Sequence, residues 1–142
     1  MQWQKLNLTF DAEPNAPSPQ VRVVGDSVEV TFFLNPFIWN NVKEGDQGRL
    51  VFNDCLKFRL GATNDEGFYR GQSRFSKTGI VWGNFYLLHQ SDWEVDFPED
   101  STLVCDRVKG DPGLRHYLFF FRDETFECIA KDSQFSVVPA AP

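Results

Sequence analysis

The C-terminal segment 116–138 constrains the fold most strongly, because its apolar residues alternate in a way that favours one hairpin register. A turn over residues 122–125 makes every facing pair on one side of this hairpin apolar. The pairs are Phe121 with Phe126, Phe119 with Cys128, and Tyr117 with Ala130. A shift of one residue would place Phe121 opposite Glu127 and move the apolar side chains to the other face. The pattern therefore predicts both the hairpin and its register.

A second turn at 131–134 adds a third strand to this hairpin, with Ala130 facing Phe135 and Cys128 facing Val137. The sequence thus predicts a C-terminal three-stranded meander with one continuous apolar face. The reverse face is also partly apolar, so it must be covered by another part of the chain. Its apolar residues are Leu118, Phe120 and Ile129. We expect this meander to be the central sheet on which the rest of the chain packs.

The segment 21–34 predicts another hairpin, with Gly25-Asp26 as a two-residue turn. This turn places Val23 opposite Val28 and Val21 opposite Val30 on one face. The other face carries Arg22 opposite Glu29, a cross-strand ion pair. The turn and the alternation of apolar residues agree on this register.

Further strands are predicted from alternation and turn signals, and one short helix is predicted after Asn35-Pro36, over residues 37–43. The strands are expected at 3–10, 48–60, 68–75, 80–88 and 102–108. The segment 48–60 has two interpretations, a long strand with a bulge at Asn53-Asp54 or a tight turn between two strands. About nine short strands predict an all-β, mainly antiparallel fold, either a sandwich or a barrel. We expect one domain, 1–142, with at most one short helix.

The composition supports a β fold and limits the classes of partner. The chain holds 15 Phe, 4 Trp and 3 Tyr, residues that favour pleated, half-buried surfaces. The net charge of −6 argues against a nucleic-acid partner and leaves basic proteins or small ligands. No apolar run reaches the ~18–20 residues that span a membrane. The three cysteines are far apart without a CxxC motif, so we expect a reduced, cytoplasmic protein.

Four basic residues flank the loop 61–67, and antiparallel strands around this loop would bring them together beside Tyr69. They are Lys57, Arg59, Arg70 and Arg74. The resulting cationic stripe has two interpretations. It is either a site for an anion or a carboxylate, or an ordinary outer sheet face whose bases pair with glutamates. The second arrangement is the more common one.

Several acidic residues are candidates for contact with a partner. Asp54 interrupts an inward-facing row, so it lies either at a turn or in a buried position that needs a partner. Three acidic pairs lie in predicted loops: Asp65-Glu66, Glu99-Asp100 and Asp123-Glu124. Together they predict an acidic rim for a basic partner, although acidic pairs in turns are often only solvated.

No motif for a metal, a cofactor or catalysis is present in the sequence. The two histidines, His89 and His116, lack the spacing of a zinc site, and Cys128 is predicted to face away from His116. Catalysis would require Asp54, His89 or His116 to converge with another polar group in a cleft. We therefore expect no catalytic residue, no cofactor and no metal.

The segments 59–75, 82–100 and 116–135 resemble a family of small, uncharacterised bacterial proteins, chiefly cyanobacterial. The likeness covers most of the chain. It implies a bacterial, cytosolic origin and carries no assigned activity or site residue.

These features predict a non-enzymatic acidic β domain that binds another protein, as an accessory, inhibitory or immunity-type partner. One alternative is a β-barrel that holds a small apolar or aromatic ligand among its Phe and Trp side chains. A more remote alternative is a hydrolase-like enzyme without a recognisable motif.

Overall fold

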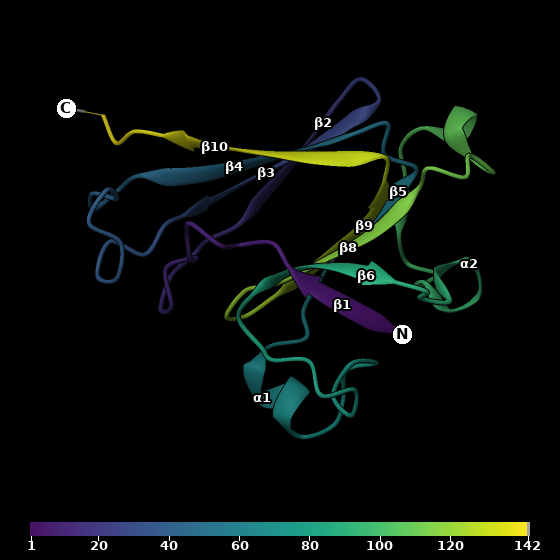
Figure 1. Cartoon of the computed structure of the whole chain (residues 1–142), viewed down its shortest axis with the longest axis horizontal. Coiled ribbons are helices and arrows are strands. Elements are labelled where there is room, and N and C mark those ends of the chain that lie inside the picture. Colours follow the sequence, from purple (N-terminus) through teal and green to yellow (C-terminus); the bar gives the residue numbers. More distant parts are fainter. Residues whose placement is uncertain (142) are drawn as a thin grey trace.

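Two antiparallel β-sheets face one another in the computed structural model, which describes residues 1–141 (Figure 1). The larger sheet has the order β1 (Gln2–Lys5), β6 (Phe85–His89), β8 (Arg115–Phe120), β9 (Thr125–Ala130), β5 (Lys57–Gly61) and β7 (Thr102–Leu103). The smaller sheet has the order β10 (Asp132–Val138), β4 (Gln47–Asn53), β3 (Ser27–Phe33) and β2 (Gln20–Val24). The helical elements are α1 (Asp65–Tyr69), α2 (Trp93–Asp96) and a 3₁₀ turn, η1 (Asp106–Val108). The all-β, antiparallel class is confirmed, and the sandwich is the correct alternative.

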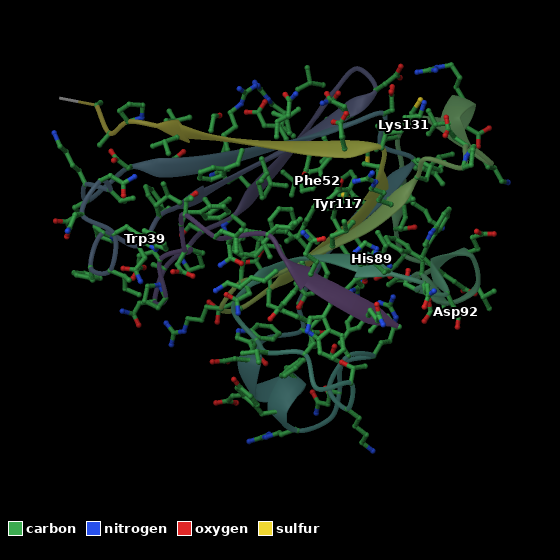
Figure 2. The ribbon with its side chains drawn as sticks, in the orientation of Figure 1. Trp39, Phe52, His89, Asp92, Tyr117 and Lys131 are labelled. Atoms are coloured by element: carbon green, nitrogen blue, oxygen red, sulfur yellow. The ribbon has the colours of Figure 1, made fainter. Side chains whose placement is uncertain are left out.

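The space between the sheets is filled by aromatic rings from both of them. Phe52 of β4 is fully buried, and its ring centroid lies 5.3 Å from those of both Tyr117 and Phe126 in the larger sheet. Phe32 of β3 meets Phe119 in the same way, with ring centroids 5.1 Å apart. Figure 2 shows Phe52 and Tyr117 side by side between the sheets. The space that a barrel would enclose is therefore filled here by the packed side chains of a sandwich.

The hairpin of β2 and β3 forms with the predicted register. Val23 pairs with Val28, and Arg22 pairs with Glu29. The guanidinium of Arg22 lies 3.1 Å from the Glu29 carboxylate on the outer face. Gly25 has φ +60°, a left-handed conformation that glycine adopts without steric cost. Turn chemistry and side-chain alternation thus agree here.

The hairpin of β8 and β9 forms, but its predicted register is wrong by two residues. Phe126 faces Phe119 rather than Phe121, and Cys128 faces Tyr117. The reason is the turn: the Phe121 N–H donates to the Glu124 carbonyl at 2.9 Å, so the loop begins one residue earlier than predicted. A two-residue shift keeps every side chain on its predicted face, and Phe121 is still buried in the core.

The predicted three-stranded meander is wrong in its third strand, because β10 pairs with β4 in the smaller sheet. β4 and β10 run side by side (Figure 1). At one end of this pair, β4 leads into β5 and β10 follows directly after β9, and β5 and β9 pair with each other in the larger sheet. The Lys131 N–H donates to the Asn53 carbonyl, and the Leu56 N–H donates to the Ile129 carbonyl. Both strands of one ladder therefore turn a corner together. This corner connects the two sheets.

Several smaller predictions need correction. The segment 68–75 is not a strand, because the Asn64 side chain accepts the Gly67 N–H at 2.8 Å and begins α1. The segment 37–43 is a series of turns rather than a helix, since the Asn35 side chain accepts the Phe37 N–H in a local turn. Residues 1–141 contain two short α-helices, α1 and α2, rather than at most one. The strands predicted at 3–10, 80–88 and 102–108 shorten to β1, β6 and β7.

The outer face of β8 and β9 is covered, as the sequence predicts. Residues from the segments 68–82 and 93–108 pack on this face in two further apolar clusters. Leu118, Phe120 and Ile129 are at most 1% exposed as a result. The central hairpin is therefore buried on both sides, so a polar side chain on its outer face must find partners within the protein. Over residues 1–141, no helix is long and apolar enough to cross a membrane.

Candidate functional site

Two ionisable side chains are buried on the outer face of the central hairpin. His116 of β8 is 1% exposed, and Glu127 of β9 is 2% exposed. The ladder places His116 opposite Ile129 and Glu127 opposite Leu118, so the two polar side chains are diagonal neighbours on one face. The His116 Nε2 lies 2.8 Å from the Glu127 Oε2. A histidine and a carboxylate are thus hydrogen-bonded in an apolar surrounding.

Arg74, from the loop after α1, forms a two-point ion pair with the same carboxylate. Its Nη1 donates to Glu127 Oε1 at 2.6 Å, and its Nη2 donates to Glu127 Oε2 at 3.3 Å. The Arg74 side chain is 33% exposed, and Asp96 lies 3.9 Å away on its solvent side. Arg74 therefore closes the site from outside and supplies the charge that balances Glu127.

Ser91 completes the network from the opposite side of the imidazole. Its Oγ lies 2.9 Å from the His116 Nδ1. Ser91 is in the short link between β6 and α2, which Figure 2 marks by the labelled His89 and Asp92. The preceding residue, Gln90, has φ +58°, a left-handed conformation that turns the chain sharply at the end of β6. We call Ser91, His116 and Glu127 the serine–histidine–glutamate chain.

When the imidazole is neutral, the hydrogen bonds of the serine–histidine–glutamate chain run in one direction, from the serine through the histidine to the glutamate. Burial alone would raise the pKa of Glu127, but the hydrogen bonds from His116 and Arg74 outweigh it and hold the pKa below its ordinary value. An ionised carboxylate only accepts hydrogen bonds, so the His116 Nε2 carries a proton. The Nδ1 of a neutral ring is then an acceptor, and the Ser91 hydroxyl donates to it.

Ser91 and His116 line an open cavity of about 480 Å³, whose polar wall also includes Gln4 and His89. A second cavity, of about 600 Å³, is lined by Lys57 and Lys109 among others. Trp93 and Leu114 line both cavities and therefore lie between them. Ser91 therefore lines one cavity, and Trp93 and Leu114 separate this cavity from a second one.

The residues of the predicted cationic stripe lie in different surroundings. Arg59 pairs with Asp100 at 2.8 Å, and it lines a cavity of about 250 Å³ together with Arg74. The Lys57 ammonium lies 4.7 Å from the Phe97 ring centroid. Tyr69 and Arg70 are exposed at the end of α1, next to Glu66 in the same helix. The structure thus brings Arg59 and Arg74 together and gives both an acidic partner.

Asp54 lies at the corner between the two sheets, half-buried and with φ +46°. It accepts a hydrogen bond from Arg107 at 3.2 Å, and the same guanidinium pairs with Asp26 at 3.1 Å. The acid is therefore in a bend, as one of the two sequence-based interpretations states. Arg107 of η1 thus contacts both the corner at Asp54 and the β2–β3 turn at Asp26.

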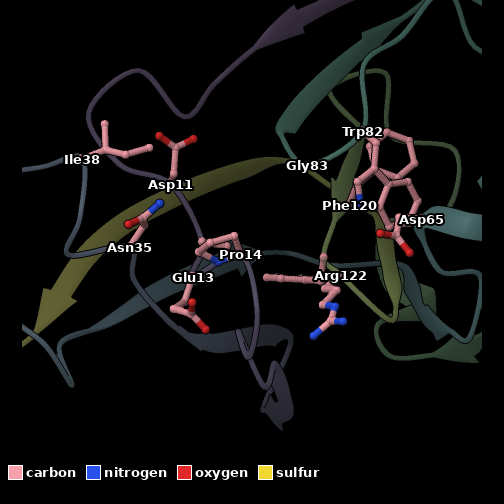
Figure 3. Close-up of a pocket in the computed structure, with 12 residues that line it drawn as sticks. Asp11, Glu13, Pro14, Asn35, Ile38, Asp65, Trp82, Gly83, Phe120 and Arg122 are labelled. Atoms are coloured by element: carbon pink, nitrogen blue, oxygen red, sulfur yellow. The ribbon is translucent and has the colours of Figure 1, made fainter.

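A pocket of about 300 Å³ lies between the loop 11–14 and the start of the 122–124 turn (Figure 3). We call it the acidic–aromatic pocket and define it by six of its lining residues. These are Asp11, Glu13, Ile38, Asp65, Trp82 and Phe120. Figure 3 shows Trp82, Phe120 and Asp65 on one side, with Glu13 and Ile38 across from them. Of its acids, only Asp65 belongs to the predicted acidic rim.

Sequence reasoning did not find Ser91, Glu127, Asp11 or Glu13 as site residues. One signal was available for Glu127: it is a charged residue in a strand whose neighbours Cys128 and Ile129 are apolar on both faces. No local pattern distinguished the other three. Asp11 and Ser91 contact residues from distant segments, Trp39 and His116, and Glu13 contacts only the backbone N–H groups of its own loop. Within the described part of the chain, no three His, Cys, Asp or Glu side chains gather to hold a metal.

The three cysteines are free and buried, Cys128 in the core between the sheets as its pattern predicts. Burial raises the pKa of the Cys128 thiol, and the neighbouring Cys55 adds to this effect. Comparison with protein-family models, curated proteins and solved structures gives no match. The resemblance to the bacterial family stays a prediction, and the sites stand on their own geometry.

Proposed function

We propose that the protein binds a basic segment of another protein at the acidic–aromatic pocket, as an accessory, inhibitory or immunity-type partner. The observation that carries this proposal is the combination of carboxylates and aromatic rings in one pocket. An arginine or lysine side chain has the matching chemistry, because its apolar stem packs on rings and its cationic head pairs with carboxylates.

The carboxylates of this pocket have no cationic partner among residues 1–141. Glu13 accepts only backbone N–H groups, from Asn15 and Ala16. The Asp65 carboxylate accepts the N–H of the next residue, Glu66. The one cation that lines the pocket, Arg122, donates to the Asn15 carbonyl at 2.8 Å. Both acids therefore keep accepting capacity for an incoming cation.

Two acidic segments lie at one side of the pocket. The Asp65 N–H donates to the Arg122 carbonyl, so the acidic pair at 65–66 lies beside the acidic turn at 123–124. These are two of the three pairs of the acidic rim. The whole chain has a net charge of −6, which favours the approach of basic partners.

Exposed apolar side chains lie next to the pocket on the loop after β3. Ile38 lines the pocket and is 66% exposed, and the adjacent Phe37 is 80% exposed. Large apolar side chains at the edge of a charged pocket are typical of protein interfaces, where they act as anchors. The pocket and these two residues together form a surface with both charge and apolar contact area.

The proposal is tested by NMR titration with two capped dipeptides, acetyl-Arg-Phe-amide and acetyl-Glu-Phe-amide. We expect saturating shifts of the Trp82 indole N–H signal with the arginine peptide and none with the glutamate peptide. The double variant Glu13→Gln/Asp65→Asn should weaken binding by about five- to thirtyfold, because two partly exposed charge contacts contribute about 0.5–1 kcal/mol each.

The matched control is Glu99→Gln, which removes one charge from an exposed acid that does not line the pocket. This control should bind the arginine peptide like the wild type. Equal responses to the two peptides, or equal loss of binding in the control and the double variant, would contradict the proposal.

A further inference from the structure

The serine–histidine–glutamate chain has no part in the proposed binding function, and its cavity shares no lining residue with the acidic–aromatic pocket. Buried charged networks are costly unless every group is satisfied, and this one ends on a hydroxyl that lines an open cavity. The network therefore ends on a residue that a small molecule in this cavity can reach.

In the serine–histidine–glutamate chain, each hydrogen bond points in the direction that activates a serine. The Glu127 carboxylate accepts from His116 Nε2, which leaves His116 Nδ1 to accept the Ser91 proton. The familiar catalytic triad uses the two ring nitrogens the other way round, with the serine on Nε2. The roles are unchanged by this exchange, since a neutral imidazole has one donor and one acceptor nitrogen.

The surroundings hold the imidazole in place. The Phe75 and Phe97 rings lie 6.3 Å and 5.7 Å from the His116 ring, measured between centroids. Arg74 orients Glu127 through two hydrogen bonds and does not contact His116 in the described hydrogen-bond network. Arg74 is therefore a positioning residue, which acts on the histidine only through the carboxylate.

From this geometry we propose that Ser91 is the nucleophile of an acyl-transfer site that hydrolyses small esters. The acyl or alcohol group of the ester would pack on Trp93 and Leu114, which line the cavity beside Ser91. The second cavity beyond these two residues accommodates the remainder of a longer substrate.

The reaction needs only the ester and water. The Ser91 Oγ attacks the carbonyl carbon and forms a C–O bond, while its proton passes to His116 Nδ1. The ester C–O bond then breaks, and the alcohol leaves with that proton. Water attacks the acyl-serine and gives one proton to Nδ1, which returns it to Ser91 Oγ as the acid is released. His116 ends neutral, and no oxidant or reductant is required.

The test is active-site labelling with a fluorophosphonate, followed by intact-mass and peptide-mass measurement. The probe loses fluoride to the serine oxygen, so each labelled residue is identified by its mass. We expect one adduct per chain, located on Ser91, and hydrolysis of 4-nitrophenyl acetate that stops when this adduct forms. Ser91→Ala should remove both, whereas the exposed Ser136→Ala should change neither.

Two further variants separate catalysis from folding. His116→Gln should slow labelling by about 100-fold or more, because a general base contributes about 10²–10⁴-fold. Ser91→Cys changes only the attacking atom and should still be alkylated faster by iodoacetamide than the buried Cys55.

The proposal would be overturned if the wild type were labelled no faster than Ser91→Ala, or if the adduct lay on another residue. Ester hydrolysis that persists in Ser91→Ala at the wild-type rate would do the same. Each of these outcomes would leave the acidic–aromatic pocket and its binding function unaffected.

Discussion

Replacement of Glu127 by glutamine tests the energetic role of the buried network. The glutamine keeps the size of the side chain but removes the charge that balances Arg74, and its NH₂ group cannot accept from a guanidinium. Removing one partner of a buried ion pair costs about 3–5 kcal/mol. Arg74 is 33% exposed, so we expect a loss of about 2–3 kcal/mol in the free energy of unfolding near neutral pH. This corresponds to a fall in Tm of roughly 5–10 °C.

The effect of this substitution depends on pH, with a sign that follows from the pKa of Glu127. Its pKa in the folded protein lies below the ordinary value of 4.5, because the hydrogen bonds from His116 and Arg74 outweigh the effect of burial. A carboxyl group with a lowered pKa stabilises the fold above its unfolded pKa and loses that contribution as the pH falls through the folded pKa. The difference between wild type and Glu127→Gln should therefore shrink steadily below about pH 4.5.

The assay is urea unfolding followed by tryptophan fluorescence, at about pH 7 and about pH 3. Other acids with lowered pKa values, such as Glu29 beside Arg49, are present in both proteins and cancel in the difference. The control is Glu99→Gln, which should change the free energy of unfolding by less than about 0.5 kcal/mol. A loss below this size for Glu127→Gln, or a loss that is the same at both pH values, would refute the reasoning.

Three further predictions concern the core. Phe52→Ala should cost about 3–5 kcal/mol in urea unfolding, because Phe52 is fully buried against three rings of the larger sheet; a loss below about 1 kcal/mol would contradict the sandwich core. Gly48→Ala should cost about 1–3 kcal/mol, since a Cβ there would lie 2.7 Å from the Phe32 ring. The three buried cysteines should not react with a thiol reagent such as DTNB in the native protein, but all should react in denaturant; fast native reaction would show that their burial is wrong.

The hairpin of β2 and β3 could be predicted in full because two independent signals agree. Gly25 allows the left-handed turn, and the alternation of Val21, Val23, Val28 and Val30 selects the inward face. The β8–β9 hairpin carries only the second kind of signal. Alternation distinguishes the two faces but cannot distinguish registers that differ by two residues, so this prediction was two residues out.

The path of β10 could not be predicted from local pattern. Its neighbour β9 is next to it in sequence, yet β10 pairs with β4, about 80 residues earlier. The alternation of Ser133 and Phe135 toward the interior fits either partner, since both sheets contribute to one core. The corner at Asp54 and Lys131 decides the partner, and it depends on hydrogen bonds between two distant segments.

The candidate sites also contain some residues that local sequence signals identify and others that depend on contacts between distant segments. The acidic pair at Asp65-Glu66 and the bases Arg59 and Arg74 were identifiable from charge and turn signals, and two of these residues line the sites described above. The pairing of Glu127 with His116 was not identifiable, because it requires the register of β8 and β9. Ser91 was still harder to identify from the sequence, since its contact with His116 depends on how the chain turns at Gln90.

The protonation of the His116 ring is the most direct test of the buried network on which the acyl-transfer proposal and the Glu127 prediction depend. Long-range ¹H–¹⁵N NMR correlations distinguish the two neutral tautomers and the charged ring. The structure predicts that the neutral ring carries its proton on Nε2, which donates to Glu127, and that its bare Nδ1 accepts from Ser91. A proton on Nδ1, or a freely exchanging ring with the shifts of solvent-exposed histidine, would contradict the account.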